Sequence, residues 1–128
     1  FIGGGIAHGP GTRVYRDRTP KKMKKKALNM AISQRLSEAS VFVLSGKDFE
    51  TPSTKQAVAS LQELKIERGF TFVYSDNDEN LYKSFKNIKN SRLVSVKKLA
   101  AIDVISTDDT IFSDNAISAF LGDESWSI

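Results

Sequence analysis

Apolar and polar positions follow one another along the chain in a way that predicts alternating strands and helices. Four short apolar runs have the composition of strands, at residues 41–44, 70–74, 92–96 and 110–112. Apolar residues recur at helical spacing over 20–39, from Pro52 onwards, over 79–88 and from Asp114 to about Gly122, with a short helical turn at 100–105. Residues 1–19 show neither pattern and are expected to be irregular.

The order of these elements predicts the fold class. Strands that alternate with helices need crossover connections, which give a mostly parallel sheet with helices on both faces. The run at 41–44 is apolar at every position, as expected of a strand covered on both sides. We therefore predict a three-layer α/β/α domain over residues 20–128 with a mostly parallel sheet of about four strands. An extended, glycine-rich basic arm over residues 1–19 precedes it.

Residue types at the helix ends predict where the helices begin. Thr19 is a favoured N-cap residue, and Pro20 suits the first helical position because its missing N–H leaves no bond unmade. The residues of the turn at 75–78 and Asp114 are expected to cap the helices that follow them. One face of the second helix is apolar and should be buried (Ala57, Val58, Leu61 and Leu64).

The net charge of +4 conceals a strong asymmetry along the chain. Residues 13–26 contain eight basic side chains and one acidic side chain, Asp17. Residues 27–128 contain eleven basic and fourteen acidic groups, a net charge of −3. A slightly acidic body with one concentrated basic end indicates a polyanionic partner that is contacted by that end.

The lysines surround the start of the first helix and are not confined to one face. With successive residues about 100° apart and Met23 set at zero, five lysines spread from about 100° to 300° (Lys21, Lys22, Lys24, Lys25 and Lys26). Later apolar positions cover about half the circumference and can pack on the sheet (Ala27, Leu28, Ala31, Ile32 and Leu36). This pattern predicts a helix whose second half is anchored and whose first two turns project from the body.

Cations at a helix N-terminus oppose the helix dipole, each at a cost of roughly 0.3–1 kcal/mol. Five lysines there favour an external anion that neutralises them, and the exposed N–H groups of a helix start suit phosphate oxygens. The simpler alternative is a solvated lysine-rich surface. A nuclear-localisation signal at 21–26 is a further alternative, but it gives no role to the neighbouring glycines.

The segment before this helix has the composition of an RNA-binding arm. Gly3, Gly4 and Gly5 can adopt positive φ and allow another backbone to approach closely. Arginines suit phosphates and flat rings suit base stacking, which makes five further residues candidates (His8, Arg13, Tyr15, Arg16 and Arg18). The arm has too little apolar surface to fold alone, so we expect it to be ordered only with a partner.

An ordered series of short motifs resembles one known family. The chain reads Gly-Gly-Gly-Ile-Ala-His-Gly-Pro at 3–10, Thr-Arg-Val-Tyr at 12–15 and Pro-Lys-Lys-Met-Lys-Lys-Lys-Ala-Leu at 20–28. Further matches lie at 49–55, at 78–81 with Ser84, Asn87 and Ile88, and at 108–112 with Ala116. The series resembles the large ribosomal subunit protein L-four family in its bacterial form, over essentially the whole chain.

The resemblance implies a structural, non-enzymatic component of the large ribosomal subunit. It implies an α/β/α domain on the subunit's outer side and a long loop that reaches through rRNA towards the peptide exit tunnel. Residues 1–18 match the returning arm of that loop, and the family's first strand, first helix and loop tip would precede Phe1. The implied location is a cytoplasmic ribosome of bacterial type, with an organellar ribosome as the alternative. The implied partners are large-subunit rRNA and neighbouring large-subunit proteins.

The resemblance carries RNA contact to nine positions (Gly3, Gly4, Gly5, Arg13, Tyr15, Lys21, Lys22, Lys24 and Lys25), while Arg16 and Arg18 rest on charge alone. Two residues depart from the family pattern. Phe1-Ile2 stands where the family usually has Trp-Arg, and His8 replaces a usual Phe. The first change removes one expected phosphate contact, and the second keeps a flat ring but adds polarity.

Other function classes are less consistent with the sequence. The absence of cysteine excludes disulfides and thiolate metal sites, and no apolar run approaches the length of a membrane span. We expect no cofactor, no metal, no membrane and no small-molecule substrate. With a single histidine, His8, in the arm, a Ser-His-Asp triad is improbable. Trp126 and the acidic pair Asp123-Glu124 receive no role from the sequence.

Two alternatives remain from other classes. Asp76, Asp78 and Glu79 follow the strand at 70–74, where a magnesium-dependent phosphotransfer or hydrolase site would lie. Capping of the next helix explains the same aspartates more simply. A generic basic DNA-binding module is the other alternative, because charge alone does not distinguish DNA from RNA. The chain shows no helix-turn-helix or zinc-finger spacing.

Overall fold

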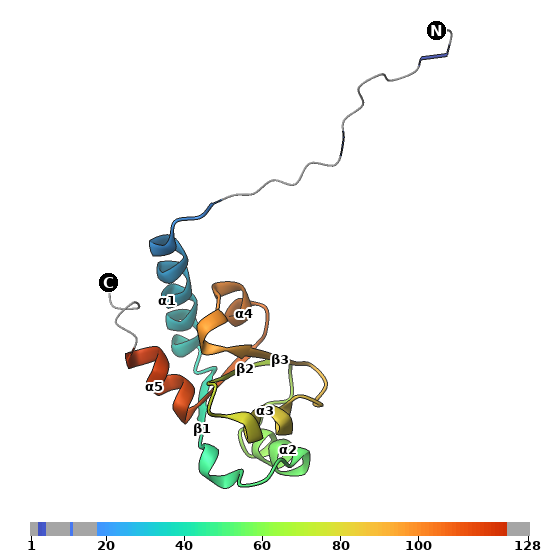
Figure 1. The fold of residues 1–128 in the computed structure, drawn as a ribbon, viewed down its shortest axis with the longest axis vertical. Helices are drawn as coiled ribbons and strands as arrows, with labels where there is room; N and C mark the ends of the chain where they lie inside the picture. The colour runs from blue at the N-terminus through green and yellow to red at the C-terminus, as the bar shows by residue number, and fades with distance from the viewer. Residues whose placement is uncertain (1–2, 5–10, 12–17, 123–128) are drawn as a thin grey trace.

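Four parallel strands form one sheet in the order β1-β4-β2-β3 (Figure 1). The computed structural model describes residues 3–4, 11 and 18–122. The elements follow one another as α1 (Lys21–Ser37), β1 (Val41–Leu44), η1 (Gly46–Asp48), α2 (Thr54–Glu63), β2 (Phe70–Tyr74), α3 (Glu79–Phe85), β3 (Ser91–Ser95), η2 (Val96–Lys98), α4 (Ala101–Ile105), β4 (Asp109–Ser113) and α5 (Asp114–Gly122).

Helices cover both faces of the sheet, and each face has its own hydrophobic cluster (Figure 1). The cluster between the sheet and helices α2 and α3 contains Phe49, Ala57, Leu61, Ile66, Phe70, Phe72, Leu81, Phe85 and Ile111. The cluster between the sheet and helices α1, α4 and α5 contains Leu28, Ala31, Val73, Val96, Leu99, Val104, Phe112 and Ala116. The predicted three-layer α/β/α class with a mostly parallel sheet is confirmed.

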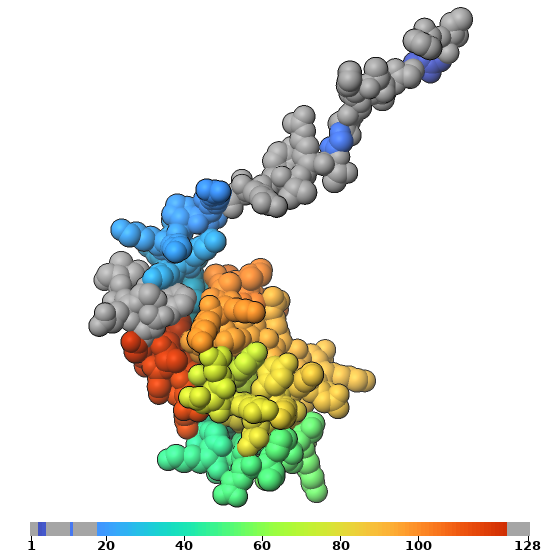
Figure 2. Space-filling view, in the orientation of Figure 1, coloured from blue at the N-terminus to red at the C-terminus, as the bar shows by residue number. Residues whose placement is uncertain are grey.

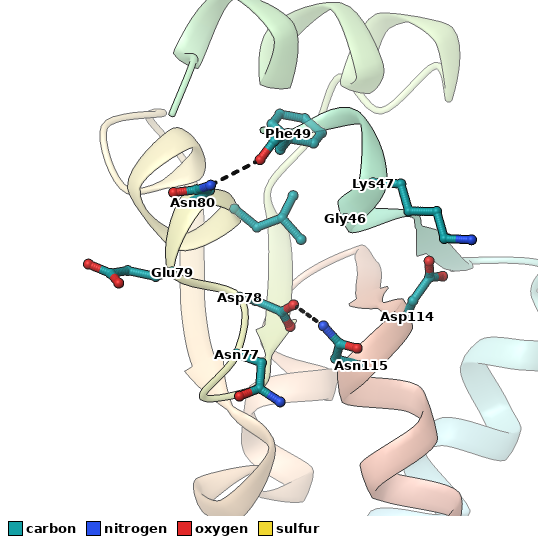
Figure 3. Close-up of a pocket in the computed structure, with 10 residues that line it drawn as sticks. Gly46, Lys47, Phe49, Asn77, Asp78, Glu79, Asn80, Asp114 and Asn115 are labelled. Carbon is teal, nitrogen blue, oxygen red and sulfur yellow. Dashed lines mark hydrogen bonds between the residues drawn. The ribbon is translucent and has the colours of Figure 1, made fainter. Parts of the chain in front are cut away.

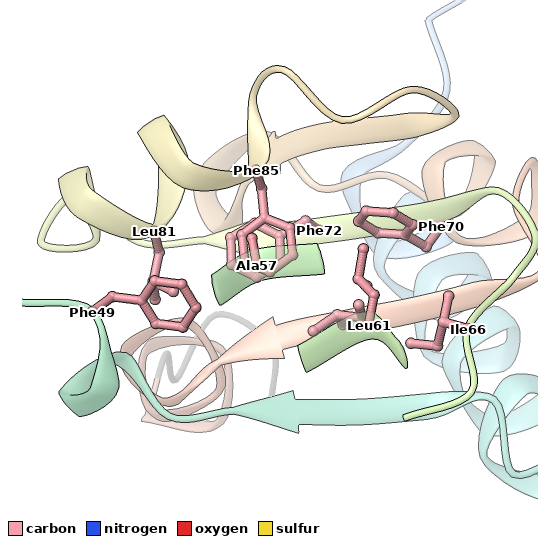
Figure 4. Close-up of a cluster of buried hydrophobic side chains, with 9 residues drawn as sticks. Phe49, Ala57, Leu61, Ile66, Phe70, Phe72, Leu81 and Phe85 are labelled. Atoms are coloured by element: carbon pink, nitrogen blue, oxygen red, sulfur yellow. The ribbon is translucent and has the colours of Figure 1, made fainter. Parts of the chain in front are cut away.

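Strand β2 supplies side chains to both clusters because successive residues of a strand point to opposite faces. Phe72 is buried on the α2–α3 side and stacks on Phe85, with ring centroids 4.4 Å apart and planes at 9° (Figure 4). Val73, the next residue, is buried on the opposite side. Complete burial of one such side chain stabilises the fold by roughly 1.5–3 kcal/mol.

Helix α1 begins one residue later than predicted. Thr19 is not the N-cap, because Pro20 has extended backbone angles (φ −56°, ψ 140°) and takes that position. The carbonyl oxygen of Pro20 accepts hydrogen bonds from the N–H groups of Met23 and Lys24, at 3.1 and 3.2 Å. At its other end the helix stops at Ser37, short of the predicted 39, because Ala39 has a left-handed φ of 54°.

Other predicted boundaries also shift. Helix α2 starts at Thr54, not at Pro52, because the Ser53 hydroxyl caps it by accepting from the N–H of Gln56 at 3.4 Å. Helix α3 ends at Phe85, whereas the prediction extended to 88. Strands β3 and β4 differ from their predicted ranges by one residue at each end, and helix α4 by one residue at its start.

Some apolar residues expected in the core are exposed. Val58 on α2 is 40% exposed, while its neighbours Ala57 and Leu61 are buried. On α1, Leu36 is 59% exposed and Ala27 is exposed, because only the face that carries Leu28 and Ala31 meets the sheet and α4. Helical periodicity identified the packing face of each helix but overestimated its width.

Candidate nucleic-acid interface

The second half of α1 is anchored to the body. Leu28 and Ala31 are 1% and 7% exposed and belong to the cluster beneath α1, α4 and α5. Ile32 packs partly against the same cluster. These residues hold one side of the helix from its third turn onwards, which agrees with the predicted anchoring.

Arg35 fastens α1 to α4 through backbone carbonyls. Its guanidinium donates to the carbonyl oxygens of Val104 (Nε, 3.3 Å), Ile105 (Nη2, 3.1 Å) and Thr107 (Nη2, 2.6 Å). Carbonyls at a helix C-terminus lack partners within the helix, so an arginine there satisfies them and complements the dipole. Nη1 of Arg35 also pairs with Glu38 at 3.0 Å. Hydrogen bonds from Gln34 and then Arg35 lower the pKa of the Glu38 carboxyl.

Helix α4 is fixed to the sheet, so it gives α1 a firm support. Asp103 is buried and forms an ion pair of 2.8 Å with Arg92 of β3. Its carboxylate also accepts from the N–H of Ala100 at 3.0 Å, and its carbonyl oxygen accepts from the Thr71 hydroxyl of β2 at 2.7 Å. The support of α1 therefore reaches β2, one of the two central strands of the sheet.

The first two turns of α1 stand at one end of the body, as the blue segment in Figure 2 shows. Lys21, Lys22, Lys24 and Lys26 are exposed, and Lys25 is half-buried. Met23 lies among them with 61% of its surface exposed. The lysines thus extend around much of the helix, as the sequence predicted.

The start of α1 has a positive field that its own helix does not offset. The first turn contains no acidic residue, and no side chain of the described residues caps it. The positive pole of the helix dipole and the lysine side chains therefore act at the same place. Such an end attracts anions, and a chain of phosphates can contact several of the lysines at once.

The structure describes only some of the predicted contact residues before α1. Gly3 and Gly4 have φ of +115° and +67°, conformations that L side chains rarely adopt, in agreement with the expected use of glycine there. Arg18 is exposed. The remaining candidates lie outside the described residues (Gly5, His8, Arg13, Tyr15 and Arg16).

The rival site lies at the carboxyl ends of the strands. A polar hollow of about 520 Å³ opens there between η1, the turn before α3 and the start of α5 (Figure 3). Asp78 is 5% exposed and accepts hydrogen bonds from the N–H of Ser75 (2.9 Å), the hydroxyl of Ser113 and the side-chain amide of Asn115 (2.7 Å). Both carboxylate oxygens are therefore already used, and they join the turn to the end of β4 and to α5.

Two sequence predictions about this turn need correction. Asp78 precedes α3, but its side chain does not cap that helix, since its oxygens bond to Ser75, Ser113 and Asn115. Asp114 is not the cap of α5, because the buried Ser113 hydroxyl accepts from the N–H of Ala116 at 3.0 Å. Sequence reasoning missed Ser113 and Asn115, which lie 35 and 37 positions from Asp78.

The other two candidate magnesium ligands form separate exposed pairs. Asp76 pairs with Lys97 and Glu79 with Lys83, each at 2.5 Å. Accordingly the pKa of Lys97 is raised by Asp76, and the pKa of Glu79 is lowered by Lys83. Within residues 3–4, 11 and 18–122, no three carboxylate or histidine side chains are grouped so that they could hold a metal ion.

No helix among the described residues has both the length and the apolar composition needed to cross a bilayer.

Comparison with known proteins agrees with the motif series. The model of the family described as "Ribosomal protein L4/L1 family" matches residues 1–122. A protein of Frankia casuarinae named large ribosomal subunit protein uL4 is 43% identical over 122 residues, which cover 94% of this chain and 50% of that protein. Proteins with the same name from Corynebacterium glutamicum and Cytophaga hutchinsonii are 40% and 34% identical, and the aligned residues cover 56% and 57% of their lengths.

The chain thus spans about half the length of the curated relatives that it matches. The match with the family model covers nearly all of the chain, including the glycine run, the lysine-bearing helix and the sheet. The chain belongs to the ribosomal protein L4/L1 family.

Proposed function

We propose that this chain is a structural component of the large ribosomal subunit that binds large-subunit rRNA and has no catalytic role. The lysine-bearing start of α1 and the basic arm before it form the RNA contact, and the α/β/α domain supports them. In this proposal the arm comprises residues 1–19 and the domain comprises residues 20–128. The mechanism is neutralisation of phosphate charge combined with recognition of RNA shape.

The observation that carries the proposal is the position of the lysines on an anchored helix. Lys21, Lys22 and Lys24 are exposed at the positive end of α1, while Leu28 and Arg35 hold the other half on the body. A helix held in this way presents its charges without a cost of ordering its backbone at the moment of binding. The contact is therefore prepared in the free protein.

The relatives support large-subunit rRNA as the partner and the ribosome as the location. Proteins that are 34–43% identical are named large ribosomal subunit proteins, and the organisms they come from are bacteria, so we propose a bacterial-type cytoplasmic ribosome as the location. Neighbouring large-subunit proteins are the further partners that follow from this. The proposed approach of the arm to the peptide exit tunnel rests on the motifs at 3–10 and 12–15.

The hollow at the carboxyl ends of the strands favours this proposal over a magnesium-dependent enzyme. Asp78, which would have to bind the metal, has its oxygens occupied by hydrogen bonds from within the domain. Asp76 and Glu79 pair with lysines on the surface. Asp78 braces the fold, and the three carboxylates are not directed together at an ion.

Binding to a large-subunit rRNA fragment at increasing salt tests the proposal. If about five phosphates are neutralised, the logarithm of the affinity should fall with the logarithm of salt concentration with a slope of roughly −3 to −4. A DNA duplex and an unrelated RNA of equal length serve as competitors. Equal affinity for all three would support the generic DNA-binding alternative and contradict rRNA recognition.

A further inference from the structure

Helices α1 and α4 lie side by side, and two hollows follow the line along which they meet (Figure 1). The first hollow, of about 680 Å³, runs beside the first half of α1 and includes Met23, Ala27 and Ile102 in its lining. The second, of about 610 Å³, runs beside the second half and includes Ala27, Met30 and Ile105. Because Ala27 lines both hollows, they form one continuous surface, which we call the α1–α4 seam.

The seam exposes a row of large apolar side chains. Met23, Met30, Ile102 and Ile105 are each 60–64% exposed. Spacings of four and three residues place Met23, Ala27 and Met30 on one face of α1. The chain has two methionines, and both lie in the seam. Methionine adapts its shape to different neighbours and is common at binding surfaces, so a row of this kind marks an interaction site.

The charges of the seam restrict what can cover it. Lys21 and Lys24 are exposed and line the first hollow, and no described residue of that lining is acidic. In the second hollow, Glu38 is paired with Arg35 at 3.0 Å. The seam is therefore positive at one end and nearly neutral along the rest. A matching ligand has acidic groups at one end and apolar side chains along its length.

The backbone of the seam offers little to an extended ligand. Along α1 the peptide groups are used in helical hydrogen bonds. Arg35 takes the carbonyl oxygens of Val104 and Ile105 at the end of α4. An extended peptide laid on the seam would bury N–H and C=O groups of its own without partners, whereas a helix satisfies its own backbone.

A nucleic acid fits only one end of the seam. No described residue that lines the second hollow is a lysine, and its arginine, Arg35, is held by Glu38 and by backbone carbonyls. Phosphates placed against Met30 and Ile105 would lose water without gaining a cation. The apolar length of the seam therefore favours a protein helix over RNA.

We propose that the α1–α4 seam is a docking site for an amphipathic helix of another protein. The apolar face of that helix covers Met30 and Ile105, and acidic residues at one of its ends lie on Lys21 and Lys24. From Met23 to Gln34 helix α1 rises by about 16 Å, so the docked helix needs about three turns. This docking does not depend on the proposed RNA contact, with which it shares only the lysine-bearing end.

The two methionines supply a direct test, because Met23 and Met30 report on different hollows. The intact chain, labelled with ¹³C at the methionine methyl groups, is titrated with a synthetic helical peptide of about 14 residues. The peptide has leucines along one face and glutamates at one end. Both methyl signals should shift with the same Kd. A control peptide of equal composition, with its leucines distributed around the helix, should bind about tenfold more weakly or worse.

A pair of matched variants tests the apolar part of the seam. Ile105→Gln removes an apolar side chain from the second hollow and should weaken peptide binding by about tenfold. Leu36→Gln is the control, since Leu36 is 59% exposed, as Ile105 is 60% exposed, but lines neither hollow. It should leave peptide binding unchanged. Circular dichroism establishes that both variants are folded, and both should bind an rRNA fragment as the parent does.

Several results would overturn the proposal. These are the absence of saturable shifts, a shift of the Met23 signal alone, equal binding of the two peptides, and equal losses in Ile105→Gln and Leu36→Gln. A dimer in sedimentation that Ile105→Gln disrupts would make a second copy the occupant. An rRNA fragment that moves both methyl signals and binds Ile105→Gln weakly would make RNA the occupant. Because RNA affinity is measured separately, failure of the docking is distinguishable from failure of RNA binding.

Discussion

The guanidinium of Arg35 donates a hydrogen bond of 2.6 Å to the carbonyl oxygen of Thr107, which is 72 positions away in the chain. The same side chain reaches the carbonyl oxygens of Val104 and Ile105. One residue of α1 therefore supplies hydrogen-bond donors to the free carbonyl groups at and just after the end of α4. This attachment helps to set the direction in which the first half of α1 projects.

Arg35→Ala should lower the free energy of unfolding by about 1–3 kcal/mol, because carbonyls that are partly buried lose a charged donor. Urea denaturation measures the change. Arg35→Lys should recover only part of the loss, since an ammonium cannot reproduce the planar set of donors. Ser33→Ala, an exposed change on the same helix, is the control. An effect of Arg35→Ala no greater than that of Ser33→Ala would contradict the anchoring role.

Replacement of Lys21, Lys22, Lys24 and Lys25 by Ala should weaken rRNA binding and flatten its salt dependence. If each lysine neutralises about one phosphate, the slope should approach zero by roughly 0.7–0.9 for each phosphate that is no longer neutralised. The fold should persist, because the apolar anchor of α1 begins at Leu28. The readout is affinity against salt for the same rRNA fragment.

A variant with four other exposed lysines changed to Ala controls for net charge (Lys47, Lys55, Lys86 and Lys89). These lysines lie in η1, in α2 and next to α3, away from the start of α1. It should retain most of the slope. Equal flattening in both variants would show that binding depends on total charge and not on the end of α1.

Asp78→Asn should destabilise the domain by about 1–3 kcal/mol. The carboxylate accepts from Ser75, Ser113 and Asn115, and the amide of an asparagine would place donor hydrogens against these donors. Thermal unfolding monitored by circular dichroism measures the loss. Asp76→Asn is the control and should change stability little, because Asp76 forms an exposed ion pair with Lys97. The absence of any difference between the two variants would exclude the bracing role of Asp78.

Phe85→Ala should cost about 3–5 kcal/mol, because it removes a ring from the centre of the cluster on the α2–α3 side. Phe85 is 0% exposed and contacts the rings of Phe49, Phe70 and Phe72. Phe85→Leu should cost less, since most of the volume remains. Equilibrium unfolding in urea gives both values, and a Phe85→Ala variant as stable as the parent would be inconsistent with this packing.

Asp109 should make stability depend on pH in the acid range. Burial, and then the neighbouring charge of Asp108, raise the pKa of the Asp109 carboxyl above its ordinary value. Between the ordinary and the raised pKa, the folded state holds a proton that the unfolded state has released. Stability from this group is therefore present at low pH and is lost as pH rises through the raised pKa.

Asp109→Asn should remove this loss of stability at higher pH, because an asparagine side chain does not ionise. The variant should gain stability relative to the parent above the raised pKa, and the gain should shrink as pH falls below it. Unfolding experiments at several pH values test this, with exposed Asp48→Asn as the control. A gain that stays constant across the acid range would contradict a raised pKa for Asp109.

The sequence predicted the elements more accurately than the contacts between them. The range of β2 and the exposure of most of the lysines on α1 were predictable because both depend mainly on the residue types in that stretch of sequence. The start of α1 was misplaced because Pro20 suits both the first helical position and an extended cap, and only its ψ distinguishes them. The exposure of Val58 depends on which neighbours reach α2, and periodicity does not contain that information.

The candidate interface was predicted only in part for the same reason. Lys21 to Lys26 form a local pattern, so sequence reasoning could place them on a helix end. The partners of Asp78 at the end of β4 and on α5, and the three carbonyls held by Arg35, lie more than thirty positions away and carry no local signal. The hollow that Met23, Leu99 and Ile102 line together likewise joins residues that are far apart in the sequence.

The extended backbone of Pro20 determines how the chain enters α1. A proline fixes its own φ and also disfavours helical angles in the residue before it, so Thr19 and Pro20 together form a short stiff joint. Residues 18–20 therefore meet the helix at its tip. Because this joint is stiff, a ligand that touches both residues 18–20 and the first turn of α1 would meet the two in a fixed geometry.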